Sequence, residues 1–332
     1  MRAVVITGKG PPDVLQVQDR PDPQAKAGQA AIDVHAAGVN FADLMARVGM
    51  YPDAPPLPAV VGYEVAGVVT ARGQGVHGIG VGDRVMAATR FGGYAEKVAV
   101  EAGNVVRLPA AMSFEEGAAV PVNYATAWTA LIRYGSLQSG ERVLIHAAAG
   151  GVGIAATQIA KHAGAEVWGT ASHAKHEAIR SIGVDRALDY RHKGWERDLP
   201  EFDVVLDAIG GRSFRTSYDL LRAGGRLVCF GASSAMSGEK RNLRSAVQMA
   251  VRLPRFNLLK QMSASKAVIG LNLLTLWDAA GTLEPWIRPL RDLLEAGVIR
   301  PRVAASVPFD RAPEAHRLLQ ERRNVGKVVL VP

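Results

Sequence analysis

The chain has 332 residues, of which 48% are hydrophobic and 21% charged, a composition typical of a globular protein that excludes low complexity. This length exceeds what one small core needs, so we expect two domains, one of them interrupted by the other. The formal net charge is +8, but the basic residues are dispersed and enriched only within 234–260, so we expect a solvated surface and no nucleic-acid partner.

Cysteine content and hydropathy exclude further classes of protein. Cys229 is the only cysteine, which excludes an internal disulfide and every metal site built from several cysteines. No apolar run approaches the length needed to cross a bilayer, and residues 1–7 lack the charged and apolar regions of a signal peptide. We therefore expect a cytosolic protein.

The first 120 residues contain short alternating or β-branched runs separated by glycine, a pattern that predicts a β-rich, barrel-like domain. The predicted strands are 2–7, 30–36, 60–70, 83–88 and 93–100. Four prolines between Tyr51 and Pro58 prevent regular structure and predict a shaped loop.

From about Ser136 the pattern changes to strands that alternate with helices. The predicted strands are 142–146, 166–170, 204–208, 226–231 and 267–273, and the predicted helices are 152–163, 175–182 and one after Ser213. Strict alternation predicts an α/β fold with a doubly wound parallel sheet, of the Rossmann type. A helix near 312–323 and a strand at 327–331 are expected to return to the first domain.

A glycine turn follows the first strand of this second region. Ala148, Gly150 and Gly153 match the dinucleotide fingerprint, with alanine at the first glycine position. Small residues there let the backbone approach a pyrophosphate, whose charge the free N–H groups at a helix start can meet. A glycine-rich turn without a ligand is the structural alternative. With a dinucleotide site, valine at Gly150 or Gly153 should abolish nucleotide binding and leave the fold largely intact.

The end of the next predicted strand bears on the choice of cofactor. An acidic residue there would hold the ribose 2′-hydroxyl of NAD and repel a 2′-phosphate. The segment 169–175 contains Thr170 and Lys175 and no carboxylate, which favours NADPH. Alternatively, Lys175 only begins a solvated helix.

With these residues in hand, the chain resembles the medium-chain dehydrogenase/reductase superfamily over essentially its full length. It is most similar to the quinone oxidoreductase and zeta-crystallin branch, and within it to the vesicle amine transport protein group. The matching motifs are GVNFADLMAR at 38–47, GDRV at 82–85, NYATAW at 123–128, the glycine turn at 148–153, TAS and KHE within 170–177, KRNL at 240–243 and NVGKVVLVP at 324–332.

The resemblance implies a GroES-like catalytic domain, formed by both ends of the chain, around a central cofactor domain. We expect the first part of the catalytic domain at 1–121 and the Rossmann NADPH-binding domain at 122–265. The last strand of the sheet and the return to the catalytic domain are expected at 266–332.

The resemblance also bears on metal content. Related zinc enzymes hold the catalytic metal through a cysteine, a histidine and a third ligand, and the matching places here carry Asn40, Tyr63 and, approximately, Val122. These side chains cannot supply the ligand set that zinc requires, so we expect no metal. Hydride transfer then requires an acceptor that is already electron-poor, namely a quinone or another conjugated carbonyl such as an enone or enal.

The candidate site residues follow from the same resemblance. Asn40 and Thr126 are expected beside the nicotinamide and ribose, and Tyr51 at the mouth of the substrate site. The candidate cofactor-binding residues are Ala149, Gly150, Gly151, Val152, Gly153, Phe230, Gly231 and Ala232, with Ser172, Lys175, Tyr190 and Arg322 at the 2′-phosphate. Each has a structural alternative: Asn40 only satisfies a turn, Tyr51 only packs on the proline loop, and Tyr190 only ends a strand. No residue is a convincing general acid, so water is expected to deliver the proton.

Partners complete the set of expectations. The run 267–273 is expected to be a last strand whose free edge needs covering, which, like the resemblance, predicts a homodimer. The alternative function is an NADPH-binding adaptor at a membrane surface with little turnover, because 240–260 mixes basic with apolar residues. More often such a stretch packs against its own protein or a dimer partner. RNA binding by the same segment is a weaker hypothesis, since Phe256 is its only aromatic residue.

Overall fold

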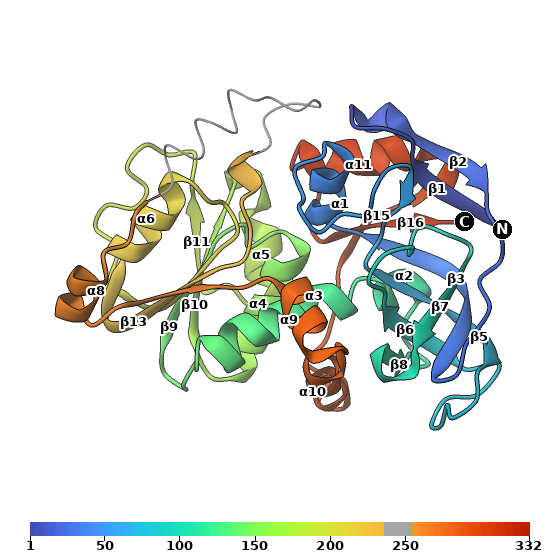
Figure 1. Ribbon diagram of the computed structural model, residues 1–332. Helices are drawn as coiled ribbons and strands as arrows, with labels where there is room; N and C mark the ends of the chain where they lie inside the picture. The colour runs from blue at the N-terminus through green and yellow to red at the C-terminus, as the bar shows by residue number, and fades with distance from the viewer. Residues whose placement is uncertain (236–253) are drawn as a thin grey trace.

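The computed structural model describes residues 1–235 and 254–332. Figure 1 shows two lobes side by side, and both ends of the chain lie in the same lobe. One lobe holds the parallel sheet that the alternating pattern predicts, and the other holds the β-rich part. No helix within the described ranges is long and apolar enough to cross a membrane.

The lobe with both termini contains two sheets within the described residues, ordered β2-β1-β4 and β15-β16-β3-β5-β6-β8, with β7 also paired to β3. Its strands are β1 (Arg2–Ile6), β2 (Leu15–Asp19), β3 (Gln29–Val39), β4 (Ala59–Val60), β5 (Glu64–Arg72), β6 (Arg84–Ala88), β7 (Lys97–Glu101), β8 (Val105–Arg107), β15 (Val303–Pro308) and β16 (Lys327–Val331). Its helices are α1 (Phe41–Arg47), α2 (Phe114–Gly117) and α11 (Ala312–Gln320). The last strand, β16, runs antiparallel to β3, so the end of the chain does return to the first sheet.

One strand predicted in this lobe is wrong. The run 60–70 is divided into β4 and β5, because Gly62 adopts a φ of +100° and turns the chain between them. The Gly62 N–H donates to Asp43 Oδ1 at 3.1 Å, which fixes this turn against the start of α1. The residue after the turn, Tyr63, is thereby placed between two strands.

The other lobe is built on a sheet ordered β11-β10-β9-β12-β13-β14, in which all neighbouring strands are parallel. Its strands are β9 (Arg142–Ile145), β10 (Glu166–Ala171), β11 (Arg186–Asp189), β12 (Phe202–Asp207), β13 (Leu221–Cys229) and β14 (Ala267–Gly270). The helices of this lobe include α3 (Pro121–Trp128), α4 (Gly151–His162), α5 (His176–Ile182), α6 (Arg212–Asp219) and α8 (Leu258–Ala264). Every residue of β12 is buried, as expected of a parallel strand covered on both faces.

The strand predicted over 267–273 is too long. It ends at Gly270, and the Asn272 side chain accepts hydrogen bonds from the N–H groups of Leu274 and Thr275. This cap starts α9 (Leu273–Ala280), so the apolar residues after Leu271 belong to a helix. A further helix, α10 (Glu284–Glu295), follows and contacts α3.

The two lobes share a hydrophobic core. One buried cluster runs from Ile145 in the parallel sheet through Tyr124 in α3 to Met86 and Val106 of the β-rich lobe. The membrane-surface alternative depends on the segment 240–260, of which 240–253 lies outside the described residues. The domain boundaries at 121/122 and 265/266 stay predictions.

The glycine turn between β9 and α4 combines two kinds of glycine. A Cβ on Gly150 would meet only the Ala147 carbonyl oxygen, at 3.3 Å, whereas a Cβ on Gly153 would lie 2.4 Å from that oxygen and 2.7 Å from Ala148 Cα. Gly153 is therefore required for packing inside the turn. Gly150 has more room, so valine at Gly153 is expected to disturb the fold more than valine at Gly150.

We predict that Gly150→Val abolishes dinucleotide binding and leaves the melting temperature close to that of wild type, because its Cβ would contact only the Ala147 carbonyl oxygen, at 3.3 Å. Gly153→Val, the matched variant, should lower the melting temperature as well, because backbone atoms must move. Thermal unfolding and titration of cofactor fluorescence measure the two effects. Normal binding by Gly150→Val would refute the proposed phosphate site.

Candidate functional site

A cavity of about 1080 Å³ is lined by residues of both lobes. All the candidate residues from the sequence line it: Asn40, Tyr51, Thr126, Ala149, Gly150, Gly151, Val152, Gly153, Ser172, Lys175, Tyr190, Phe230, Gly231, Ala232 and Arg322. The fold thus brings together segments that lie up to 282 positions apart, from Asn40 to Arg322. Their roles stay proposals, but their common location is a property of the structure.

The glycine turn opens α4 toward this cavity. Gly150 is the residue before the helix, and no side chain caps the N–H groups at the helix start. These unpaired donors and the positive end of the helix dipole form a cradle for an anion. Behind the turn, Gly326 N–H donates to the Ala149 carbonyl oxygen at 2.9 Å, so the segment before β16 supports the cradle.

Lys175, which follows β10, also lines the cavity. Its Nζ donates to the carbonyl oxygens of Arg322 and Asn324, both at 2.6 Å. Burial lowers the pKa of Lys175, and the nearby guanidinium groups of Arg191 and Arg322 lower it further. Three cations therefore gather here, and Arg191 is one that the sequence analysis missed.

A buried polar network lies behind the glycine turn, around His146. Its ring nitrogens contact Thr170 Oγ1 at 3.2 Å and Ser217 Oγ at 3.0 Å, and Ser217 also donates to Asp207 Oδ2 at 2.7 Å. Burial lowers the pKa of His146, which keeps the ring neutral. Since His146 and Thr170 also line the cavity, the network supports its wall.

A second buried network surrounds Asn40. The Asn40 Oδ1 atom accepts from Lys327 Nζ at 2.6 Å, and its Nδ2 atom donates to Glu64 Oε1 at 3.1 Å. Lys327 also forms an ion pair with Glu64, whose other oxygen accepts from the Val122 N–H at 2.8 Å. Asn40 therefore does more than satisfy a turn. The sequence analysis missed Glu64 and Lys327, although a lysine opening an apolar strand was a usable signal.

A further part of the cavity lining, called here its apolar end, consists of aromatic and aliphatic side chains from the β-rich lobe and from residues 271–283. They are Phe41, Met45, Met50, Tyr51, Tyr63, Leu271, Leu274, Trp277 and Leu283. The Tyr51 and Tyr63 rings are edge-on, with centroids 6.3 Å apart. Burial, with a contribution from Asp53, raises the pKa of Tyr51 to about 12, so its hydroxyl stays protonated at neutral pH. Tyr51 thus offers a donor as well as packing.

Helix α9, which supplies Leu274 and Trp277, is tied to the β-rich lobe by two polar contacts. Arg90 forms a two-point ion pair with Asp278, with both N–O distances 2.8 Å. Asn272 Nδ2 donates to Asp53 Oδ2 at 3.2 Å, beside the proline loop that carries Tyr51. These contacts hold α9 over the apolar end of the cavity.

The places that match the zinc ligands of related enzymes hold Asn40, Tyr63 and Val122. Asn40 is bound by Lys327 and Glu64, Tyr63 is a phenol, and the Val122 side chain has no donor atom. Within the described residues, no group of three His, Cys, Asp or Glu side chains is arranged to hold a metal ion. The residues present do not fit a zinc ion.

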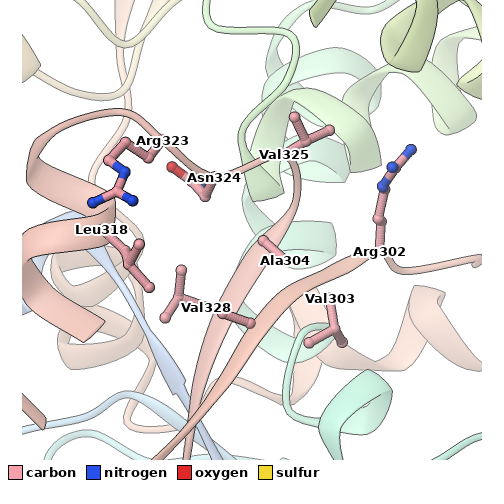
Figure 2. A pocket seen from close by; sticks show the side chains of 9 residues that line it. Arg302, Val303, Ala304, Leu318, Arg323, Asn324, Val325 and Val328 are labelled. Atoms are coloured by element: carbon pink, nitrogen blue, oxygen red, sulfur yellow. The ribbon is translucent and has the colours of Figure 1, made fainter. Parts of the chain in front are cut away.

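Figure 2 shows a smaller pocket, of about 210 Å³, beside the end of α11 and strand β15. Arg302 and Arg323 lie on opposite sides of it and do not point toward one another. None of the candidate residues lines this pocket. The larger cavity is therefore the candidate site.

Comparison with known proteins agrees with this architecture. Residues 26–110 match the family described as alcohol dehydrogenase GroES-like domain, and residues 182–330 match the family described as zinc-binding dehydrogenase. The human synaptic vesicle membrane protein VAT-1 homolog is 39% identical over 340 residues, covering 100% of this chain and 86% of that protein.

Solved structures extend the likeness to the whole chain. The mycobacterial protein Rv1454c, complexed with NADPH, has a TM-score of 0.85 and 33% identity, covering 100% of both chains. A quinone oxidoreductase from Pseudomonas syringae has a TM-score of 0.84 and 30% identity, covering 100% of this chain and 99% of that one. An NAD-dependent alcohol dehydrogenase has a TM-score of 0.84 and 31% identity over 100% of both chains. The GroES-like lobe, the Rossmann-like parallel sheet and these relatives together show that this chain belongs to the medium-chain dehydrogenase/reductase superfamily of oxidoreductases, with VAT-1 homologs and quinone oxidoreductases among its relatives.

Proposed function

We propose that this chain is an NADPH-dependent oxidoreductase that reduces a quinone or another conjugated carbonyl without zinc. The observation that carries the proposal is that one cavity is lined by an anion cradle, by Lys175 and Arg322, and by a set of aromatic and aliphatic side chains. NADPH would supply the hydride. The chain's own residues would bind and orient the two reactants and exclude water.

The cofactor would lie along the wall formed by the parallel sheet. The free N–H groups at the start of α4 would hold the pyrophosphate, and the open backbone at Gly150 would let it approach. Phe230, Gly231 and Ala232, which follow β13, would provide backbone contacts. Asn40 and Thr126 would lie beside the nicotinamide and ribose, and Asn40 would keep one orientation because Lys327 and Glu64 hold its amide.

The acceptor would occupy the apolar chamber beside Tyr51. Side chains from the proline loop and from α9 would exclude water there, which would strengthen any hydrogen bond to an oxygen on which charge develops. The places of the zinc ligands hold no cation-binding set, so the acceptor itself must be electron-poor. Water would deliver the proton.

The choice of NADPH over NADH would depend on the cations around Lys175. The end of β10 carries Thr170, Ala171 and Ser172 and no carboxylate that would repel a 2′-phosphate. Lys175 and Arg322 line the cavity, and Arg191 lies close enough to Lys175 to lower its pKa. Lys175 is already fixed by two carbonyl oxygens, so the site is preorganised for an anion.

We predict that the purified protein oxidises NADPH in the presence of quinones, enones or enals, and that a chelator leaves the rate unchanged. A panel of the three acceptor classes, with elemental analysis of the same sample, tests both parts. Simple ketones are the matched control, because their carbonyl is not activated and should be reduced far more slowly. Turnover that depends on one zinc per chain, or reduction of ketones alone, would refute the proposal.

For the cofactor, we predict that Arg322→Ala and Lys175→Ala each weaken NADPH binding by about ten- to a hundredfold and leave NADH nearly unchanged, since one charge-assisted contact is lost. Arg323→Ala is the matched control, because Arg323 is exposed, pairs with Glu321 and does not line the large cavity. Fluorescence titrations with both nucleotides measure the effect.

The preference for NADPH over NADH should also weaken as the pH rises, because only protonated Lys175 attracts the 2′-phosphate. Since the pKa of Lys175 is lowered, this loss should occur at a lower pH than it would for a lysine with the ordinary pKa. Equal losses for NADH and NADPH in the two variants would mean that these cations support the fold or the pyrophosphate. A wild type that prefers NADH would refute the cofactor assignment.

We also propose that the protein is a homodimer. Strand β14 lies at the edge of the parallel sheet, paired on one side to β13 among the described residues. Helix α8 precedes it in the chain and exposes Leu258, Leu259 and Met262 by 70%, 72% and 67%. A partner would cover this edge and these side chains. Light scattering should give twice the 35.3 kDa of one chain, and a monomer at micromolar concentration would contradict the proposal.

A further inference from the structure

Tyr63 lines the apolar end of the cavity but has no role in the function proposed above. It lies in the turn between β4 and β5, and only 5% of it is exposed. Its ring is edge-on to Tyr51 and packs on Phe91, with a centroid distance of 5.3 Å to the latter. Tyr51 and Tyr63 therefore lie side by side in the lining of the same cavity.

The backbone around Tyr63 is fixed on both sides. The Thr89 N–H donates to the Tyr63 carbonyl oxygen at 2.8 Å, and the Thr89 hydroxyl donates to the Gly62 carbonyl oxygen at 2.8 Å. The Gly62 N–H is held in turn by Asp43. These bonds join the turn to β6 and α1, so the position of the phenol is set by the fold.

The hydroxyl of Tyr63 is buried without a hydrogen-bond partner among the described residues. The nearby carboxylate of Asp43 already accepts from Tyr94 Oη at 2.8 Å and from the N–H groups of Asn40 and Gly62. Buried tyrosine hydroxyls ordinarily have a hydrogen-bond partner, and a buried hydroxyl without one is energetically unfavourable. A hydroxyl donor in the wall of a binding cavity is satisfied when a ligand supplies the acceptor atom.

The chemistry of the phenol suits a donor and not a base. Burial raises the pKa of Tyr63, and the neighbouring Asp43 and Tyr51 raise it further, so the hydroxyl keeps its proton. The Asn40 amide, by contrast, is engaged by Lys327 and Glu64. Tyr63 is thus a polar group at this end of the cavity with a hydrogen bond still to make.

We propose that the Tyr63 hydroxyl donates a hydrogen bond to the carbonyl oxygen of the acceptor. This inference rests on the proposed function and adds a residue that binds the acceptor. Negative charge grows on that oxygen as hydride reaches the conjugated system, and a donor in a dry site stabilises that charge. No bond to the Tyr63 proton breaks, because water remains the source of the proton.

Tyr63→Phe tests the proposal, since it removes the hydroxyl and keeps the ring. We expect kcat/KM for the quinone or enone to fall by about ten- to a hundredfold, as for one lost donor to a developing oxyanion, while the Kd for NADPH stays unchanged. The melting temperature should stay the same or rise, because the hydroxyl has no partner to lose.

Two matched variants complete the experiment. Tyr94→Phe removes a hydroxyl that donates to Asp43, so it should lower the melting temperature and show what loss of a partnered hydroxyl does. Tyr124→Phe removes a buried hydroxyl that donates to Gln158 at 2.7 Å, away from the cavity lining, and should leave kcat/KM unchanged.

The outcomes separate this inference from the function on which it rests. If wild type reduces none of the acceptors, the proposed function fails. If wild type is active and Tyr63→Phe keeps the same kcat/KM, the role of Tyr63 is refuted and the function stands. A Tyr63→Phe variant whose melting temperature falls together with its activity would also refute the role, because the hydroxyl would then be structural.

Discussion

The buried ion pair between Lys327 and Glu64 is the interaction on which the site depends. Both side chains are almost fully removed from solvent, where an unpaired charge would be strongly unfavourable. The remaining polar atoms are satisfied by Asn40 and by the Val122 N–H. This network joins four segments that are distant in sequence: the residue before α1, the start of β5, the start of α3 and the start of β16. Asn40, Val122 and Lys327 of this network line the cavity.

The network around Lys327 and Glu64, called the junction below, lies where the two lobes meet at the cavity. The N-terminal half of α3 carries Val122 on one side of the junction and leads into the core of the parallel sheet. The same cavity is also lined by the glycine turn and Lys175 from one lobe and by Tyr51 and Tyr63 from the other. The contacts of Asp278 in α9 with Arg90, and of Asn272 before α9 with Asp53, hold this helix against the β-rich lobe.

The polar groups of the site divide into those that are satisfied by the fold and those that are not. Asn40, His146 and Lys175 are all held by neighbouring side chains or carbonyl groups, which sets their orientation. The N–H groups at the start of α4 and the Tyr63 hydroxyl lack such partners among the described residues. A folded protein tolerates few unsatisfied polar groups, so those that line a cavity point to the atoms of a ligand.

The sequence by itself determined the glycine turn, the alternation of strands and helices, and the absence of a carboxylate after β10, because each is a local pattern within a few residues. It could not determine that 273–280 forms α9, since a short apolar run suits a strand or a helix equally and the Asn272 cap decided the matter. Only the tertiary structure placed Lys327 against Glu64, 263 positions away, and Lys175 against the carbonyl of Arg322, 147 positions away. Such pairs depend on the order of strands in the sheets and on which side chains are buried together, and no local period in the sequence carries that information.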